Sequence, residues 1–130
     1  MTQSKAETPL TALVAEDDDE IGEILEFMIA REGFKVLRAH DGREAIRLIE
    51  ESDAPDLILL DVMLPYHDGF ELIAKVRARA GWESIPVVML TARSQENDIA
   101  RALEAGANDY VVKPFQPQEL IARMRRLLKR

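Results

Sequence analysis

The chain has 130 residues, no cysteine, 17 basic and 24 acidic side chains, and a formal net charge of -7. This length is typical of one soluble domain, and the negative charge disfavours attraction of the whole domain to nucleic acid or anionic lipid. Without thiols, the chain can form neither a disulfide framework nor a thiolate metal site. Residues 1–9 are polar, and no apolar run approaches the roughly 18 residues of a membrane span. We therefore expect a cytoplasmic protein with a polar tail over residues 1–9 and one domain over residues 10–130.

The domain begins with an apolar run that stops abruptly at the acidic residues 16–19, as a buried strand does at a loop. Apolar residues at helical spacing then predict a helix over residues 21–29 that ends near Gly33. The same unit of strand and helix repeats to the C-terminus. Five segments have strand patterns, namely residues 10–15, 34–39, 56–60, 87–90 and 110–112. Five helical patterns follow them, over residues 21–29, 45–49, 70–76, 99–103 and 120–128.

Strands and helices that alternate through short loops predict a doubly wound α/β fold, with a five-stranded parallel sheet covered by five helices on its two faces. In such sheets the ligand site lies beyond the carboxyl ends of the strands, where the strand order reverses. The residues that directly follow strands one, three, four and five are Glu16 with Asp17, Asp61, Thr91 and Lys113. Three acids, a hydroxyl and an ammonium group are therefore predicted to converge on one rim of the sheet.

Three carboxylates in a partly desolvated cleft repel one another and need a counter-charge. Mg²⁺ suits them, because it prefers oxygen ligands and accepts a few protein carboxylates while it keeps several waters. The residual negative charge can be balanced by Lys113. A central carboxylate that lies beside Mg²⁺, a lysine and a hydroxyl group is equipped to accept a phosphoryl group.

Simpler interpretations exist for the same residues. An acidic run such as residues 16–19 is typical of a solvated helix start, and Thr91 or Lys113 alone carries little information. Asp61 is harder to explain in this way, because it ends the most apolar strand, where a charge is costly without a partner or a function. The position of all these residues at strand ends favours a functional site.

Four motifs are informative together: the pair Glu16-Asp17, the segment 61–69, the pair Thr91-Ala92, and the segment 106–110 that leads to residues 113–115. With them the chain resembles, from Leu10 to Arg130, the receiver domain of bacterial two-component response regulators. The resemblance implies the flavodoxin-like strand order 2-1-3-4-5. It also supports a cis peptide bond before Pro114.

The resemblance implies a signalling switch that is not an enzyme for external substrates. Asp61 would accept the phosphoryl group from a sensor histidine kinase or a histidine phosphotransfer protein. The implied Mg²⁺ ligands are Glu16, Asp17, Asp61 and the backbone carbonyl of Met63. Thr91 and Lys113 would hold the phosphate, and the switch would move Thr91 toward it while Tyr110 turns inward.

Within the family the chain looks most similar to receivers of winged-helix transcription factors, which pair through helix four, strand five and helix five. The residues at the positions of intersubunit ion pairs are Glu104, Asp109, Glu119, Arg123 and Arg125. Ile99 departs from the pattern, because that branch usually has a basic partner for Glu119 there. We expect a phosphorylation-dependent homodimer and no direct nucleic-acid binding by this domain, since the basic residues near Arg130 suit the C-terminus of a helix.

Two other functions share parts of this pattern. A Mg²⁺-dependent phosphatase with an aspartate nucleophile would also place an acid after a parallel strand, but enzymes similar to the haloacid dehalogenase group need a second acid two residues later, where this chain has Met63. A flavodoxin-like flavin carrier shares the topology, but the acidic residues 16–19 would repel a flavin phosphate unless a metal intervened.

Overall fold

The structure is a computed structural model that describes residues 9–92 and 96–128. Within these residues, five strands alternate with five helices. The strands are β1 (Leu10–Ala15), β2 (Phe34–Ala39), β3 (Leu57–Asp61), β4 (Val87–Thr91) and β5 (Asp109–Val112). The helices are α2 (Asp19–Arg31), α3 (Gly42–Glu51), α4 (Gly69–Ala78), α5 (Glu96–Glu104) and α6 (Pro117–Leu128). The predicted polar tail falls outside the described residues, except for Pro9.

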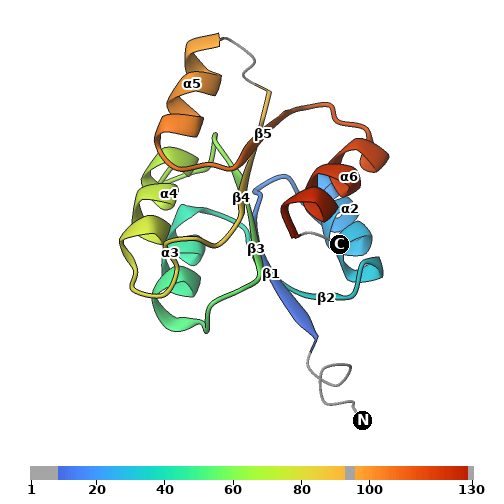
Figure 1. Ribbon diagram of the computed structural model, residues 1–130, viewed down its shortest axis with the longest axis horizontal. Coiled ribbons are helices and arrows are strands. Elements are labelled where there is room, and N and C mark those ends of the chain that lie inside the picture. The colour runs from blue at the N-terminus through green and yellow to red at the C-terminus, as the bar shows by residue number, and fades with distance from the viewer. Residues whose placement is uncertain (1–8, 93–95, 129–130) are drawn as a thin grey trace.

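The strands form one parallel sheet in the order β2-β1-β3-β4-β5. In Figure 1, α3, α4 and α5 lie on one face of the sheet, and α2 and α6 lie on the other. The predicted doubly wound α/β fold and the strand order 2-1-3-4-5 are therefore confirmed.

Two apolar cores separate the sheet from its two helical layers. Alternate residues of β3 enter the two cores: Ile58 and Leu60 pack toward α3 and α4, whereas Leu57 and Leu59 pack toward α2 and α6. Every residue of β3 and β4 is buried. Because both faces of these strands are covered, their sequences are apolar up to their last residues, Asp61 and Thr91, instead of alternating.

The helices begin earlier than the apolar pattern predicts, because polar residues cap them. The side chains of Asp18, Asp41 and Asp68 each accept a hydrogen bond from a backbone N–H in the first turn of α2, α3 and α4. Asp68 also forms a capping box with Glu71. These caps set the direction in which each helix leaves the rim of the sheet.

Strand boundaries differ from the prediction by one residue in four places, one of which is the start of β5 at Asp109 instead of Tyr110. Asp56 precedes β3 instead of starting it, and its carboxylate accepts a hydrogen bond of 2.8 Å from the Thr11 N–H. Asp61 and Thr91 are the last residues of β3 and β4, not the first residues after them. The peptide bond between Lys113 and Pro114 is cis, as expected. No helix among the described residues has the length and apolar character of a membrane span.

Candidate functional site

The rim at the carboxyl ends of the strands holds three buried polar residues. Within residues 9–92 and 98–128, the polar residues that are buried as whole residues are Glu16, Asp61 and Thr91. Glu16 directly follows β1, and the other two end β3 and β4. Burial of a polar or charged group is costly unless it has partners or a function, so these three positions mark the candidate site of the sheet.

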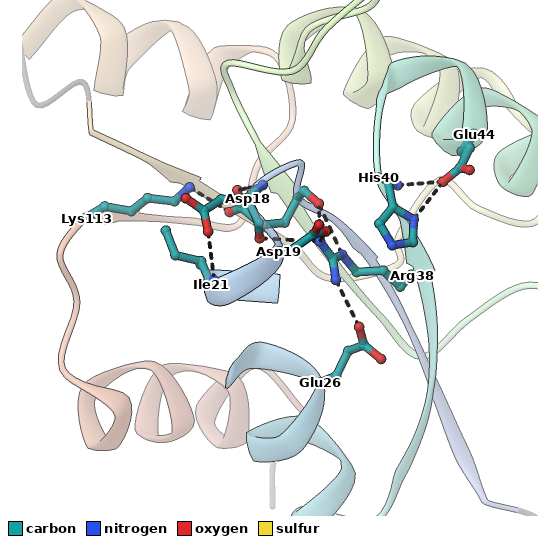
Figure 2. Close-up of polar contacts among 9 residues, drawn as sticks. Asp18, Asp19, Ile21, Glu26, Arg38, His40, Glu44 and Lys113 are labelled. Atoms are coloured by element: carbon teal, nitrogen blue, oxygen red, sulfur yellow. Dashed lines mark hydrogen bonds and ion pairs between the residues drawn. The ribbon is translucent and has the colours of Figure 1, made fainter. Parts of the chain in front are cut away.

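Lys113 provides the counter-charge for the two buried acids. Its Nζ lies 2.6 Å from Glu16 Oε1 and 3.0 Å from Asp61 Oδ2. Lys113 directly follows β5 at the edge of the sheet, and its side chain crosses the rim toward the central strands β1 and β3. Figure 2 shows it reaching toward the loop that carries Asp18. Lys113 therefore contacts Glu16 and Asp61, as the sequence predicts.

The pKa values of these groups reflect burial and pairing. Burial raises the pKa of Glu16, and the nearby Asp61 carboxylate raises it further, whereas hydrogen bonds from Lys113 and the Asp18 N–H oppose the rise. Burial alone would lower the pKa of Lys113, but its hydrogen bonds and charge attraction to Glu16 and Asp61 outweigh burial, and the net effect is a raised pKa. The lysine therefore carries its charge at neutral pH.

A set of carboxylate oxygens suitable for a cation lies beside this lysine. One oxygen from each of Glu16, Asp17 and Asp61 falls within 4.8 Å of the other two, and Asp17 is the exposed member of the three. All three donors are hard oxygens, which is the ligand type that Mg²⁺ prefers. One lysine cannot neutralise three carboxylates, so the charge of the cleft also fits a divalent cation.

Met63 lies on the loop that follows Asp61. Its backbone N–H donates a hydrogen bond of 3.1 Å to Asp61 Oδ1, and its side chain is largely exposed. Asp61 therefore accepts hydrogen bonds on both oxygens, one from this N–H and one from Lys113. The role of the Met63 carbonyl as a metal ligand stays a prediction.

Thr91 and Tyr110 connect the cleft with the outer strands. Thr91 is fully buried, and its carbonyl accepts a hydrogen bond of 2.8 Å from the Lys113 N–H, so the backbones of two predicted phosphate-binding residues are joined. Tyr110 on β5 is 9% exposed and belongs to the core beneath α5. The structure thus shows the inward position of this tyrosine, whereas the predicted change of position remains a prediction.

The predicted interface residues largely pair within the chain. Arg123 on α6 contacts both carboxylate oxygens of Asp109 at 3.0 Å and Glu119 at 3.0 Å. Arg125 instead pairs with Glu32, at the end of α2, at 2.8 Å. Glu104 ends α5 and is exposed, and Ile99 packs against the core. The structure brings Asp109, Glu119 and Arg123 together and directs Arg125 to another surface.

Comparison with known proteins identifies the family. The response regulator receiver domain family matches residues 12–125. The chain belongs to this family. A response regulator from Chloroflexus aurantiacus is similar to this receiver domain, with 41% identity over 95% of this chain and 100% of that chain, and a TM-score of 0.86.

Two further solved receiver domains match this chain over 100% of their own length. One belongs to a sensor histidine kinase of Pseudomonas aeruginosa, is 32% identical over 95% of this receiver domain with a TM-score of 0.84, and has a magnesium ion coordinated in its active-site cleft. The other is the BeF₃-activated DrrB receiver domain, which is 30% identical over 95% of this chain with a TM-score of 0.84. This chain is therefore a receiver domain of two-component signalling, a class of signalling switches.

Sequence analysis missed one residue beside the site, Arg38 on β2. Its guanidinium donates to the backbone carbonyl of Glu16 from Nε at 3.1 Å and from Nη2 at 2.8 Å. Two signals in the sequence point to it: Arg38 is a charged residue near the end of a short strand, and the isolated Gly22 weakens a helical pattern where alanine would favour it.

Proposed function

We propose that this receiver domain is a phosphoacceptor switch in which Asp61 takes a phosphoryl group from a histidine kinase or a histidine phosphotransfer protein with the help of Mg²⁺. The observation that carries the proposal is the position of Lys113 Nζ, 2.6 Å from Glu16 and 3.0 Å from Asp61, at the edge of the three-carboxylate cluster. A carboxylate beside an ammonium group and a cation site is suited to attack a phosphoryl group.

Transfer joins the phosphorus to a carboxylate oxygen of Asp61 and breaks the bond from phosphorus to the donor nitrogen. The donor imidazole keeps the electron pair of that bond, so no redox partner is needed. Glu16, Asp17 and Asp61 would hold Mg²⁺, which when bound neutralises charge on the transferring oxygens. Lys113 would exchange its hydrogen bond with Asp61 for one with the phosphoryl oxygens, and Thr91 would donate its hydroxyl to them.

The test is intact-mass spectrometry of the protein after incubation with acetyl phosphate and MgCl₂. We expect one added phosphate in the wild type, none with EDTA, and none in Asp61→Asn. Asp53→Asn is the matched control, because Asp53 is an exposed acid in the loop before β3, at the opposite end of that strand from Asp61. Addition of phosphate to Asp61→Asn at the wild-type level would refute the assignment.

The finer proposal is a phosphorylation-dependent homodimer through α5, β5 and α6, of the kind expected for receivers of winged-helix transcription factors. The supporting observations are the cluster of Asp109, Glu119 and Arg123 on this surface and the side chain of Leu103, which is 49% exposed on α5. Exposed ion pairs contribute about 0 to 1 kcal/mol each. The exposed pair of Arg123 with Glu119 would therefore exchange with an intermolecular one at little cost, whereas the Asp109 carboxylate is only 12% exposed and its pair with Arg123 is costlier to replace. Apolar contact would supply most of the affinity.

Sedimentation of the protein treated with beryllofluoride tests this dimer. We expect self-association that is absent without beryllofluoride and that is weakened by Arg123→Glu. A monomer at high micromolar concentration, or a dimer that Arg123→Glu leaves unchanged, would refute the proposed interface and favour a receiver that acts by binding another protein.

A further inference from the structure

Arg38 lies between the end of β2 and the first turns of α2, as Figure 2 shows. Although β2 is an edge strand, the Arg38 side chain is only 7% exposed. Two of its nitrogens donate to one acceptor, the backbone carbonyl of Glu16, at 3.1 and 2.8 Å. This carbonyl belongs to the peptide that joins Glu16 to Asp17, so Arg38 contacts the backbone between two of the three clustered carboxylates.

The rest of the guanidinium binds the same loop and helix. Nη2 also contacts the Asp18 carbonyl at 3.3 Å and the Asp19 carboxylate at 3.4 Å, and Nη1 donates to Glu26 on α2 at 3.0 Å. From the same strand, the Ala39 carbonyl accepts a hydrogen bond of 3.1 Å from the Glu16 N–H. Both backbone polar groups of Glu16 are thus held by adjacent residues of β2.

Gly22 provides the space for this arrangement. An ideal Cβ atom at Gly22 would lie 2.0 Å from Arg38 Cζ and 2.2 and 2.3 Å from its two terminal nitrogens. Glycine is less favourable than any other ordinary residue except proline in the interior of a helix. Helix α2 nevertheless has glycine where the guanidinium of Arg38 lies, and the absence of a side chain there lets the guanidinium pack against the helix backbone.

We propose that Arg38 is a positioning residue for the cation site, and that it acts by fixing the peptide between Glu16 and Asp17 so that both carboxylates face Asp61. This inference rests on the proposed binding of Mg²⁺. The three carboxylates repel one another, and a loop free to move would separate them. The planar fork of an arginine binds a carbonyl with two nitrogens and so restricts its orientation, which a lysine cannot do.

The charge of Arg38 and its hydrogen-bond geometry predict opposite changes in the affinity for Mg²⁺ when the side chain is removed. The positive charge of the guanidinium opposes a second cation nearby, so a purely electrostatic role would make Mg²⁺ bind more tightly after the removal. Loss of the orienting hydrogen bonds would weaken binding, and residues that orient metal ligands typically change affinity by about 10-fold to 100-fold. The sign of the change therefore separates the two roles.

The experiment is a titration of the wild type, Arg38→Met and Arg38→Lys with MgCl₂. Binding is monitored in proton–nitrogen correlation spectra, which also report whether each variant is folded. We expect the dissociation constant for Mg²⁺ to rise by about 10-fold in both variants, since neither can orient the Glu16 carbonyl. Lys35→Met is the matched control, because it removes one exposed positive charge near the start of the same strand. Its dissociation constant should equal that of the wild type.

A second perturbation leaves the arginine in place and removes its space. Gly22→Ala should displace the guanidinium and weaken Mg²⁺ binding as Arg38→Met does, although alanine favours the helix. In the double variant that combines Gly22→Ala with Arg38→Met, the two losses of Mg²⁺ affinity should not add, because both substitutions act on one contact. Unchanged affinity in Arg38→Met, tighter binding in it, or full rescue by Arg38→Lys would each overturn the inference. If the wild type itself shows no Mg²⁺-dependent shifts, the proposed function fails instead.

Discussion

Replacement of Lys113 by methionine would leave the two buried acids of the cleft without the cation that pairs with both. Lys113 Nζ lies 2.6 Å from Glu16, which is fully buried, and 3.0 Å from Asp61, which is 4% exposed. Removal of one partner of a buried ion pair typically costs about 3 to 5 kcal/mol, because the remaining charge is left in a poorly solvated place.

The expected loss in Lys113→Met is at the lower end of that range, about 3 kcal/mol at neutral pH. Burial already raises the pKa of Glu16, so this acid can lose its charge by protonation once the lysine is absent. Against a total stability of about 5 to 15 kcal/mol for a domain, this loss is large. For a domain of this size, about 3 kcal/mol corresponds to a decrease of roughly 10 °C in the thermal midpoint.

Thermal denaturation in EDTA, followed by circular dichroism at several pH values, measures the loss. With Lys113 absent, the pKa of Glu16 in the folded state lies further above its ordinary value of 4.5. A raised carboxyl pKa contributes stability at low pH that is lost as the pH rises through it. The deficit of Lys113→Met relative to the wild type should therefore shrink as the pH falls from about 7 toward about 5.

Mg²⁺ should also reduce the deficit, because it supplies the positive charge that the variant lacks. Lys75→Met is the control, since Lys75 is an exposed residue of α4, and it should melt like the wild type. A loss below about 1 kcal/mol, which is typical of exposed ion pairs, would refute the reasoning. A deficit that is the same at pH 5 and pH 7 would also refute it.

Three further predictions concern other parts of the domain. At 100 times its dissociation constant, Mg²⁺ should stabilise the wild type by about 2.7 kcal/mol, and Asp17→Asn should abolish the rise in thermal midpoint; an equal rise in both would contradict the metal site. Asp68→Ala should cost about 1 kcal/mol in urea denaturation, because the capping box of α4 is lost; no change would show that the cap is unimportant. Because pairing raises the pKa of Lys113, its contribution should be fully present below about pH 10.5 and be lost as the pH rises through the raised value; an advantage over Lys113→Met that already declines between about pH 8 and about pH 10 would argue against this pairing.

The fold was predictable because its pattern has few alternatives. A strand such as β3, which is apolar at every position before Asp61, must be covered on both faces, and alternation with helices then leaves a doubly wound parallel sheet as the simplest arrangement. The rule that sites lie beyond the carboxyl ends of the strands placed Glu16, Asp61 and Lys113 together before any distance was known. The structure places Lys113 Nζ between these two acids.

Details that depend on side-chain direction were not predictable in the same way. Helix α2 starts at Asp19 because the carboxylate of Asp18 accepts from a backbone N–H of its first turn, a local bond that apolar spacing does not report. The pairing of Arg125 with Glu32 requires α6 to lie beside α2 with one particular rotation. Periodicity gives the buried face of each helix but not the partner of each exposed charge.

Sequence analysis missed the contact of Arg38 with Glu16 because the contact depends on how two elements are placed in space. The end of β2 lies beside the start of α2 because β1 and β2 pair with Ala15 opposite Ala39. A sequence shows that Arg38 is a charge near the end of a strand and that Gly22 lies inside a helix, but it does not show that the two positions meet. Only the three-dimensional structure joins these two signals.

The order of the strands also has a kinetic consequence. Glu16 directly follows β1, and Asp61 ends β3. These two strands are neighbours in the sheet but far apart in the chain, and the two acids meet when Ala15 comes to lie opposite Leu60. We expect such non-local pairing to be completed late in folding, since closing the long loop between the strands costs entropy before the contact is gained. A cation that needs both acids can therefore bind only a nearly complete fold, so Mg²⁺ should slow the unfolding of this domain and leave its rate of folding almost unchanged.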